Sequence, residues 1–195
     1  EEYTVEREGD QNIVGGIFKG RVKNIEPGLK AMFVDIGLDK NAFLHFWDAI
    51  PAALDAGLEE LQREGKKKQQ KKITSKDIPD IYPVGSEIVI QVSKGAIGTK
   101  GPRVTTNISL AGRYLVLMPY TEQFGISRKI ENHEERQRLK RILRKLHIPD
   151  GMGVIMRTVG EGQRERYFVR DLALLLDEWN QIQEKIKSQP SATCV

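Results

Sequence analysis

Apolar and polar positions alternate between Val14 and Phe46, and glycine and proline interrupt the alternation. A period of two with tight turns is typical of short antiparallel strands. In residues 13–26 we expect Val14, Phe18 and Val22 to face the core, with the basic side chains between them facing outward. The first part of the chain is therefore predicted to be all-β.

Further strands are predicted in AMFVDIG and NAFLHF, where the flanking apolar residues suit the core and leave Phe33 and Phe43 on the outer face. Strands are also predicted over Glu87–Lys94 and Arg103–Leu110, whereas a short helix is expected around Ile50–Arg63. The run GKKKQQKK after that helix is expected to be a solvated loop. Five strands with this spacing suit an OB-type barrel.

The pattern becomes mixed after Gly112. Short strands are predicted in YLVLMP, GISRKI and GVIMRT, and helices over about Glu134–Leu146 and Arg166–Lys187, where leucine and isoleucine recur at helical spacing. Pro190 is expected to stop the second helix. The predicted fold class is therefore α+β, with a five-stranded β-barrel followed by a small α/β unit.

Composition narrows the class of protein. The 195 residues, 39% of them hydrophobic, can form two small domains, and the net charge of +4 is too mild to establish a polyanionic partner by itself. The single cysteine, Cys194, provides neither a disulfide framework nor a cysteine-based zinc site, which fits a reducing cytoplasm. No run approaches the roughly 18 apolar residues of a membrane span. Because the chain begins with Glu-Glu and ends with SATCV, we expect it to be a piece of a longer protein.

The outer face of the predicted barrel combines aromatic and basic side chains. Aromatic rings stack on unpaired bases, and lysine and arginine neutralise phosphates, so this mixture suits single-stranded RNA. The alternative is that the aromatic rings cover another domain and that the basic residues are simply solvated. The candidate RNA-binding residues are Lys19, Arg21, Lys23, Phe33, Phe43, His45, Lys100 and Arg103.

An arginine and a hydroxyl residue end the predicted strand GVIMRT, just before VGEG. Arg157 offers a planar set of donors, Thr158 adds a hydroxyl, and nearby glycines let backbone N–H groups approach phosphate oxygens. An Arg-Thr dipeptide near glycine is also common in ordinary turns. The candidate phosphate site comprises Arg157, Thr158, Gly112, Val116 and Arg128.

A third basic region lies on the predicted helix around residues 134–146, and here a solvated face is favoured. Its residues are Arg136, Arg138, Lys140, Arg141, Arg144 and Lys145. The sequence contains no catalytic pair of carboxylates, metal cluster, nucleophile elbow or P-loop that we recognise. We therefore expect no catalytic residue, metal or cofactor in this chain.

Several separated blocks of the sequence resemble the ribonuclease E/G family. GRVKNIEPGLKAMFVDIG followed by AFLHF is similar to its S-one type RNA-binding domain, an OB-fold, and KGPRVTTNISLAGRYLVLMP, GISRKI and LHIPDGMGVIMRT are similar to its 5′-sensor subdomain. The resemblance implies a single-strand-specific endoribonuclease that processes ribosomal and transfer RNA, initiates messenger RNA decay and prefers a 5′-monophosphate. A stand-alone OB-fold RNA-binding module associated with translation is the alternative.

The resemblance also implies roles for single residues. Phe33, Phe43 and Lys100 match RNA contacts, and Arg157 and Thr158 match the residues that hold the terminal phosphate. The residues that match the lining of that pocket are Gly112, Val116 and Arg128. The insertion GKKKQQKK, and His45 where members of the family often have proline, depart from the family pattern.

The resemblance further divides the chain. Residues 1–17 and 191–195 are expected to be partial RNase H-like segments, with the OB-fold over 18–110 and the 5′-sensor subdomain over 111–190. The catalytic subdomain with its magnesium-binding aspartates, and the zinc link of a homo-oligomer, are expected downstream. The chain is then expected not to cleave RNA alone.

Overall fold

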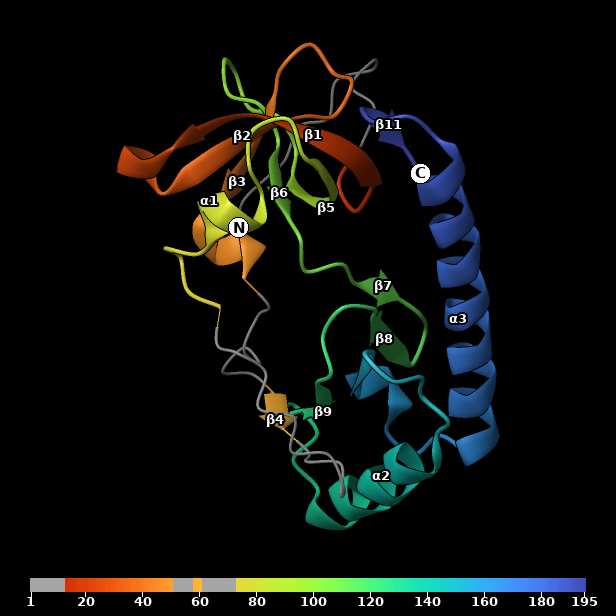
Figure 1. Cartoon of the computed structure of the whole chain (residues 1–195). Coiled ribbons are helices and arrows are strands. Elements are labelled where there is room, and N and C mark those ends of the chain that lie inside the picture. Colours follow the sequence, from red (N-terminus) through yellow and green to blue (C-terminus); the bar gives the residue numbers. More distant parts are fainter. Residues whose placement is uncertain (1–12, 51–57, 61–72) are drawn as a thin grey trace.

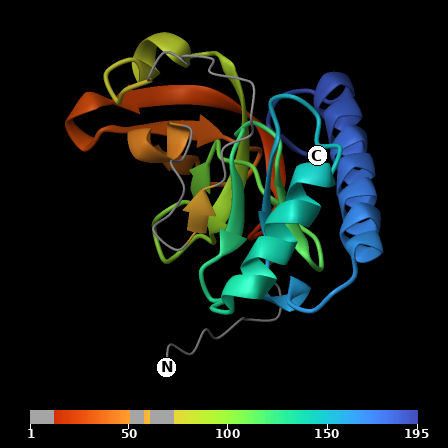
Figure 2. The ribbon, with the colours of Figure 1, turned by 90° about the horizontal axis from the view of Figure 1, so that it is seen from below.

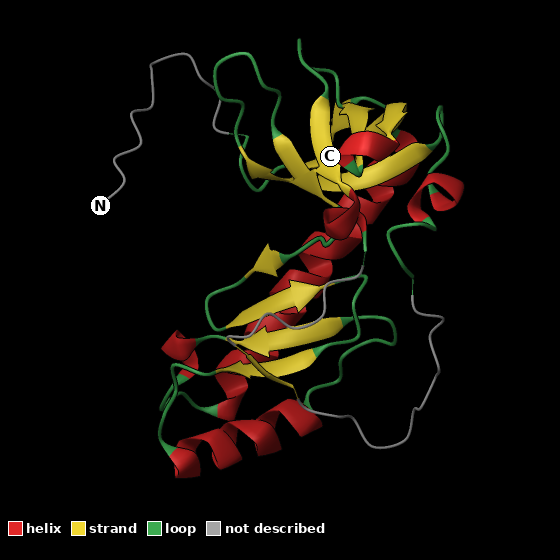
Figure 3. Cartoon of the chain, turned by 90° about the vertical axis from the view of Figure 1, so that its left-hand side faces the viewer, coloured by secondary structure: helices red, strands yellow, loops and turns green. Residues whose placement is uncertain are grey.

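The computed structural model describes residues 13–50, 58–60 and 73–195. A β-barrel lies at one end of the molecule, and a second sheet with helix α2 (His133–Lys145) lies at the other (Figures 1 and 3). Helix α3 (Glu165–Ser188) runs from the second sheet to the barrel (Figure 1). At about 1.5 Å per residue its 24 residues span about 36 Å, which is enough to connect the two ends.

Five of the described strands close into a barrel in the order β1-β2-β3-β6-β5, with β5 returning to β1. Strands β3 and β6 are parallel, and the other neighbours are antiparallel. This closure confirms the predicted OB-type barrel and the α+β class. The strands are β1 (Ile17–Glu26), β2 (Ala31–Asp35), β3 (Ala42–His45), β5 (Glu87–Lys94) and β6 (Arg103–Thr105).

The barrel core follows the predicted alternation, with Phe18, Val22 and their counterparts on β2 and β3 buried. The expectation for Val14 was wrong, because this residue precedes β1 and is 53% exposed. Gly15, with a φ of +85°, turns the chain directly after it. The period-two pattern therefore starts only at the strand itself.

The predicted helix around Ile50–Arg63 is also wrong where the structure describes it. Leu58–Glu60 form strand β4, which pairs antiparallel with β9 (Phe124–Ser127), while residues 51–57, 61–63 and the loop GKKKQQKK lie outside the described residues. Pairing with an open sheet edge satisfies the backbone of β4 and overrides its local preference. The 3-10 helix η2 (Phe46–Ala49) precedes this region, and the short helix α1 (Ile78–Ile81) follows it.

The second sheet has the order β4-β9-β10-β8-β7 among the described strands. The predicted strand Arg103–Leu110 is thus divided, since β6 ends in the barrel and β7 (Leu110–Ala111) begins this sheet. Strands β8 (Leu115–Met118) and β10 (Gly153–Met156) pair antiparallel, and β10 pairs parallel with β9. Their buried side chains pack with α2 and α3 in one core, which Ile17 of the barrel joins.

A buried carboxylate connects α3 to this sheet. Asp171 accepts hydrogen bonds from the backbone N–H groups of Arg113, Tyr114 and Leu115 at 3.1, 2.8 and 2.9 Å. A Cβ atom on Gly112 would lie 2.6 Å from its Oδ2 atom, so the turn between β7 and β8 requires glycine at this position. The carboxylate thus determines the path of the chain into β8.

The C-terminal segment returns to the barrel. Strand β11 (Thr193–Cys194) pairs antiparallel with β1, and the Ser191 hydroxyl donates a hydrogen bond to Glu87. Lys19 and Arg21 form ion pairs with Glu87 at 3.2 and 3.6 Å. The hydroxyl of Ser191, and next the ammonium group of Lys19, lower the pKa of Glu87. This charged cluster therefore holds the end of the chain on the barrel.

We predict that Asp171→Ala lowers the free energy of unfolding by about 3 kcal/mol, because it leaves buried backbone N–H groups without an acceptor. Asp177→Ala, an exposed position on the same helix, is the matched control and is expected to change it by less than about 0.5 kcal/mol. Urea unfolding measures both. Equal midpoints for the two variants would show that Asp171 does not stabilise the fold.

A second prediction concerns pH. Because the folded-state pKa of Glu87 is lowered, its contribution to stability is present above its ordinary pKa of 4.5 and is lost as the pH falls through the folded value. The thermal midpoints of the wild type and Glu87→Gln should therefore differ at neutral pH and converge in acid. A difference that stays constant down to pH 3 would contradict this account.

Candidate RNA interface

An aromatic pair lies on the outer face of β2 and β3. Phe33 and Phe43 are opposite each other in the register, with ring centroids 5.8 Å apart and ring planes at 70°. The ring of His45 lies 6.5 Å from that of Phe43. All of these side chains are half-buried, so each ring leaves part of its surface open to solvent. Such surfaces can stack on unpaired bases.

Basic side chains border the aromatic pair. Arg103 is the neighbour of Phe43 in the register, and its guanidinium group binds Asp48 at 2.7 Å. Lys23 forms an ion pair with Asp35 at 3.2 Å. The backbone N–H of Gly37, together with Lys23, lowers the pKa of Asp35. The charges of Arg103 and Lys23 are therefore partly neutralised by these carboxylates.

Lys100 lies in the loop between β5 and β6. The loop reaches the start of β3, since the N–H of Phe43 donates to the carbonyl of Pro102 at 2.8 Å. Lys100 is exposed, and among the described residues its ammonium group has no ion-pair partner. It can therefore bind a phosphate without first breaking an ion pair.

The structure does not bring all the predicted RNA-binding residues together. Phe33, Phe43, His45 and Arg103 form one surface; Lys23 pairs with Asp35 of β2, and Lys100 lies in the loop that reaches the start of β3. Lys19 and Arg21 instead belong to the cluster with Glu87 that holds the C-terminal segment. Alternation along β1 shows that they face outward, but it cannot show which neighbours they meet.

The candidate phosphate site lies at one edge of the second sheet. Arg157 follows β10 directly, and its Nη1 atom donates to the carbonyl of Gly112 at 2.5 Å. Its backbone N–H donates to the carbonyl of Tyr114 at 2.8 Å. Arg128 follows β9, the parallel neighbour of β10, so it leaves the sheet at the same edge. Thr158 begins the 3-10 helix η3 (Thr158–Gly160).

Val116 lies deeper along the sheet. It is opposite Ile155 on β10 and Ala111 on β7, on the face away from the buried side chains of Leu115 and Leu117. Arg157 alternates onto the same face as Ile155. The sheet thus places Gly112, Val116 and Arg157 beside one another, while Arg128 and Thr158 lie at the ends of their elements.

Residues that position this site were not identified from the sequence. Asp171 was missed, although a carboxylate within the apolar stripe of a helix is the kind of signal that indicates a buried partner. The Tyr114 ring also packs against Tyr167 and Phe168 of α3, with centroids 6.1 and 5.8 Å away. These contacts join the start of β8 to α3.

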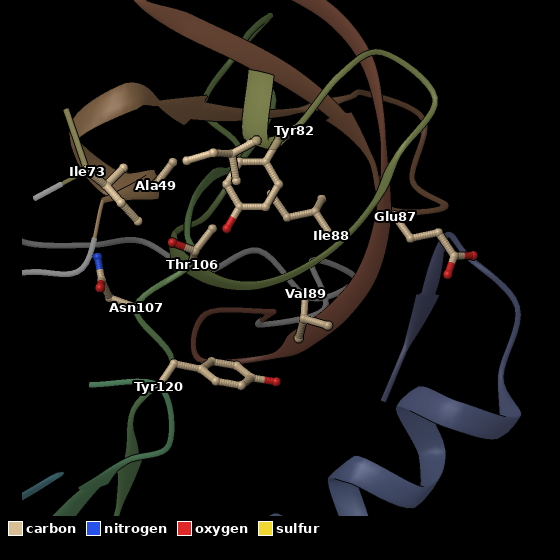
Figure 4. A pocket seen from close by; sticks show the side chains of 10 residues that line it. Ala49, Ile73, Tyr82, Glu87, Ile88, Val89, Thr106, Asn107 and Tyr120 are labelled. Atoms are coloured by element: carbon tan, nitrogen blue, oxygen red, sulfur yellow. The ribbon is translucent and has the colours of Figure 1, made fainter. Parts of the chain in front are cut away.

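A pocket of about 360 Å³ lies between the barrel and the second sheet (Figure 4). Tyr82 and Ile88 line it from the barrel, and Tyr120 lines it from the chain after β8 (Figure 4). Burial raises the pKa of both tyrosines. The lining is largely apolar and contains none of the predicted site residues. This pocket therefore differs in chemistry from the phosphate site.

The described residues contain no group of three or more histidine, cysteine, aspartate or glutamate side chains that could hold a metal ion. In the same part of the chain, none of the helices is sufficiently long and apolar to cross a membrane.

Comparison with known proteins gives consistent matches. Residues 109–195 match the model of the Ribonuclease E/G family. The chain is 42% identical to Ribonuclease G of Escherichia coli K12 over 187 residues, which cover 96% of this chain and 36% of that protein. It is 40% identical to Ribonuclease G of Haemophilus influenzae, covering 97% and 37%. It is 39% identical to Ribonuclease E of Nostoc sp., covering 90% and 23%.

The chain thus spans little more than a third of the length of the ribonucleases G that it matches. The matched region includes both the barrel and the second sheet, since it covers 96% of this chain. The closed barrel, the α+β subdomain and these identities agree with one another, and the chain belongs to the ribonuclease E/G family.

Proposed function

We propose that this chain is the RNA-binding and 5′-monophosphate-sensing part of a single-strand-specific endoribonuclease. The parent enzyme would act in the processing of ribosomal and transfer RNA and in messenger RNA decay. The observation that carries the proposal is the orientation of Arg157, whose guanidinium group is held by the carbonyl of Gly112 beside Thr158.

The contact with Gly112 uses one donor of the Arg157 guanidinium group. Its remaining N–H groups are available for a phosphate, and the hydroxyl of Thr158 adds a donor. Hydrogen bonds to charged groups contribute about 1.5–3 kcal/mol each. Since 1.4 kcal/mol corresponds to tenfold in affinity, one such bond is sufficient for about tenfold discrimination between a 5′-phosphate and a 5′-hydroxyl.

The barrel supplies the second part of the proposed function. Phe33 and Phe43 offer ring surfaces to the bases of a single strand, and Lys100 offers a charge to its backbone. Stacking depends on the rings and tolerates any base, so this surface would hold RNA without strong sequence preference. The barrel would therefore contribute affinity, and the phosphate site would select the 5′ end.

Cleavage itself is proposed to take place in other parts of the parent enzyme. The magnesium ions, the zinc link between subunits and the cytoplasmic location inferred from the family resemblance belong to that proposal. We further propose that residues 1–17 and 191–195 are parts of an RNase H-like subdomain. The described strand β11 pairs with the barrel, which is compatible with an adjoining subdomain at that edge.

We predict that the chain binds a short single-stranded RNA about tenfold more tightly with a 5′-phosphate than with a 5′-hydroxyl, and that Arg157→Ala abolishes the difference. Fluorescence anisotropy measures both affinities. Arg170→Ala, an exposed arginine on α3, is the charge-matched control and should preserve the difference. Equal binding of both RNAs by the wild type would leave a generic RNA-binding barrel and reject the 5′-end sensor.

A separate prediction concerns the barrel. Phe33→Ala and Phe43→Ala should each weaken binding of both RNAs by about 1–3 kcal/mol, since stacking on a base is lost. The preference for the 5′-phosphate should persist, because the phosphate site is unchanged. Phe33→Leu retains an apolar side chain but removes the ring, and it should weaken binding nearly as much. Wild-type affinity in Phe33→Leu would show that Phe33 acts by packing and not by stacking.

A further inference from the structure

A basic groove lies between α2 and the start of α3, at the end of the molecule away from the barrel. Figure 2, seen from that end, draws both helices, and Figure 1 shows α2 next to the first turns of α3. The groove has a volume of about 400 Å³. Its lining residues are Arg138, Arg141, Ile142, Arg144, Lys145 and Glu165. Cations from one helix therefore gather in a concave surface and are not dispersed over a convex face.

One wall of the groove is fixed by hydrogen bonds. Arg138 binds both carboxylate oxygens of Glu135 at 2.7 and 2.6 Å and donates to the carbonyl of Gln163 at 2.7 Å. Glu135 also accepts from the N–H of Gly162 at 2.8 Å, and the bond from Arg138 lowers its pKa. These bonds attach α2 to the loop over residues 158–165 and hold Arg138 in place.

Two of the cations that line the groove are not neutralised by a described residue. Lys145 pairs with Glu165 at 3.1 Å. Arg141 and Arg144 are exposed, and among the described residues their guanidinium groups have neither an ion-pair nor a hydrogen-bond partner. Cations held this close together repel one another, and an external anion would relieve that repulsion. The groove is thus suited to a ligand that presents several negative charges.

We propose that this groove binds the phosphate backbone of double-stranded RNA, as a contact separate from the 5′-end site. Among the described residues the lining contains no aromatic ring, whereas recognition of single strands depends on stacking. Double-stranded RNA is recognised mostly through its shape and its phosphates. Side chains three or four positions apart on a helix lie about 5–6 Å from one another, a spacing comparable to that of neighbouring phosphates along a strand.

The location of the groove favours a different RNA segment from the one at Arg157. Both sites border the loop over residues 158–165, because Arg157 precedes it and Arg138 is bonded to its Gln163. A strand whose 5′ end lies at Arg157 and whose following nucleotides run to the barrel leaves the groove unoccupied, so a folded stem elsewhere in the substrate can bind there. The inference rests on the proposed function only in taking RNA as the ligand.

The test uses a hairpin RNA with a 5′-hydroxyl and no single-stranded tail, measured by fluorescence anisotropy at several salt concentrations. In Arg141→Ala/Arg144→Ala, the hairpin should bind about tenfold more weakly at low salt. The slope of the logarithm of the binding constant against that of the salt concentration should fall by about 2, since each phosphate contact contributes roughly 0.9. The control Lys185→Ala/Lys187→Ala removes the same charge at the far end of α3 and should leave both values unchanged.

Each other outcome is informative. Unchanged hairpin binding in the groove variant overturns the proposal, as does an equal loss for the single-stranded 5′-phosphate RNA. If the groove binds labelled polyglutamate but not the hairpin RNA, the result would instead indicate an acidic protein partner and would also overturn the proposal. Arg157→Ala should not affect the hairpin, so failure of the 5′-end sensor and failure of the groove are distinguishable. Circular dichroism shows whether each variant is folded.

Discussion

A buried carboxylate on α3 holds the turn from which the candidate phosphate site is built. Asp171 accepts hydrogen bonds from consecutive backbone N–H groups at the start of β8, and glycine at position 112 makes room for it. The carbonyls of Gly112 and Tyr114 then receive the side chain and backbone of Arg157. Through this turn, the orientation of the guanidinium group depends on the Asp171 carboxylate.

Helix α3 extends this constraint to the barrel. Its buried side chains from Phe168 to Ile182 belong to the core of the second sheet, and the segment after α3 returns across β1 to the cluster of Lys19, Arg21 and Glu87. In that cluster Lys19 and Arg21 of β1 pair with Glu87, although their outward-facing positions alone would leave them free to bind RNA. Of the predicted RNA-binding residues, the barrel surface keeps the rings of Phe33 and Phe43, the charge of Lys100, and Lys23 and Arg103 with their ion pairs, which suits binding by stacking more than by long-range attraction.

The loop over residues 158–165 separates two basic environments. On one side Arg157 and Thr158 offer a small site suited to a terminal phosphate, and on the other the α2 groove offers several cations in a row. Glu135 and Arg138 attach the loop to α2, so both surfaces share one border. Under the two proposals, one substrate would bind through both its free 5′ terminus and a folded stem.

Local patterns in the sequence were sufficient for the barrel strands, for α2 and α3, and for the outward position of Phe33 and Phe43. These depend on the periods of two and 3.6 residues, which the backbone imposes on any chain. The family motifs indicated Arg157 and Thr158.

The structure alone decided matters that depend on partners distant in sequence. Leu58–Glu60 became a strand because β9 has an open edge, and Asp171 binds the backbone of Tyr114, which lies 57 residues earlier in the sequence. Lys19 and Arg21 form ion pairs with Glu87, and Arg141 and Arg144 line a groove together with Glu165 at the start of α3. Tertiary packing determines which outward-facing charges become neighbours in this way.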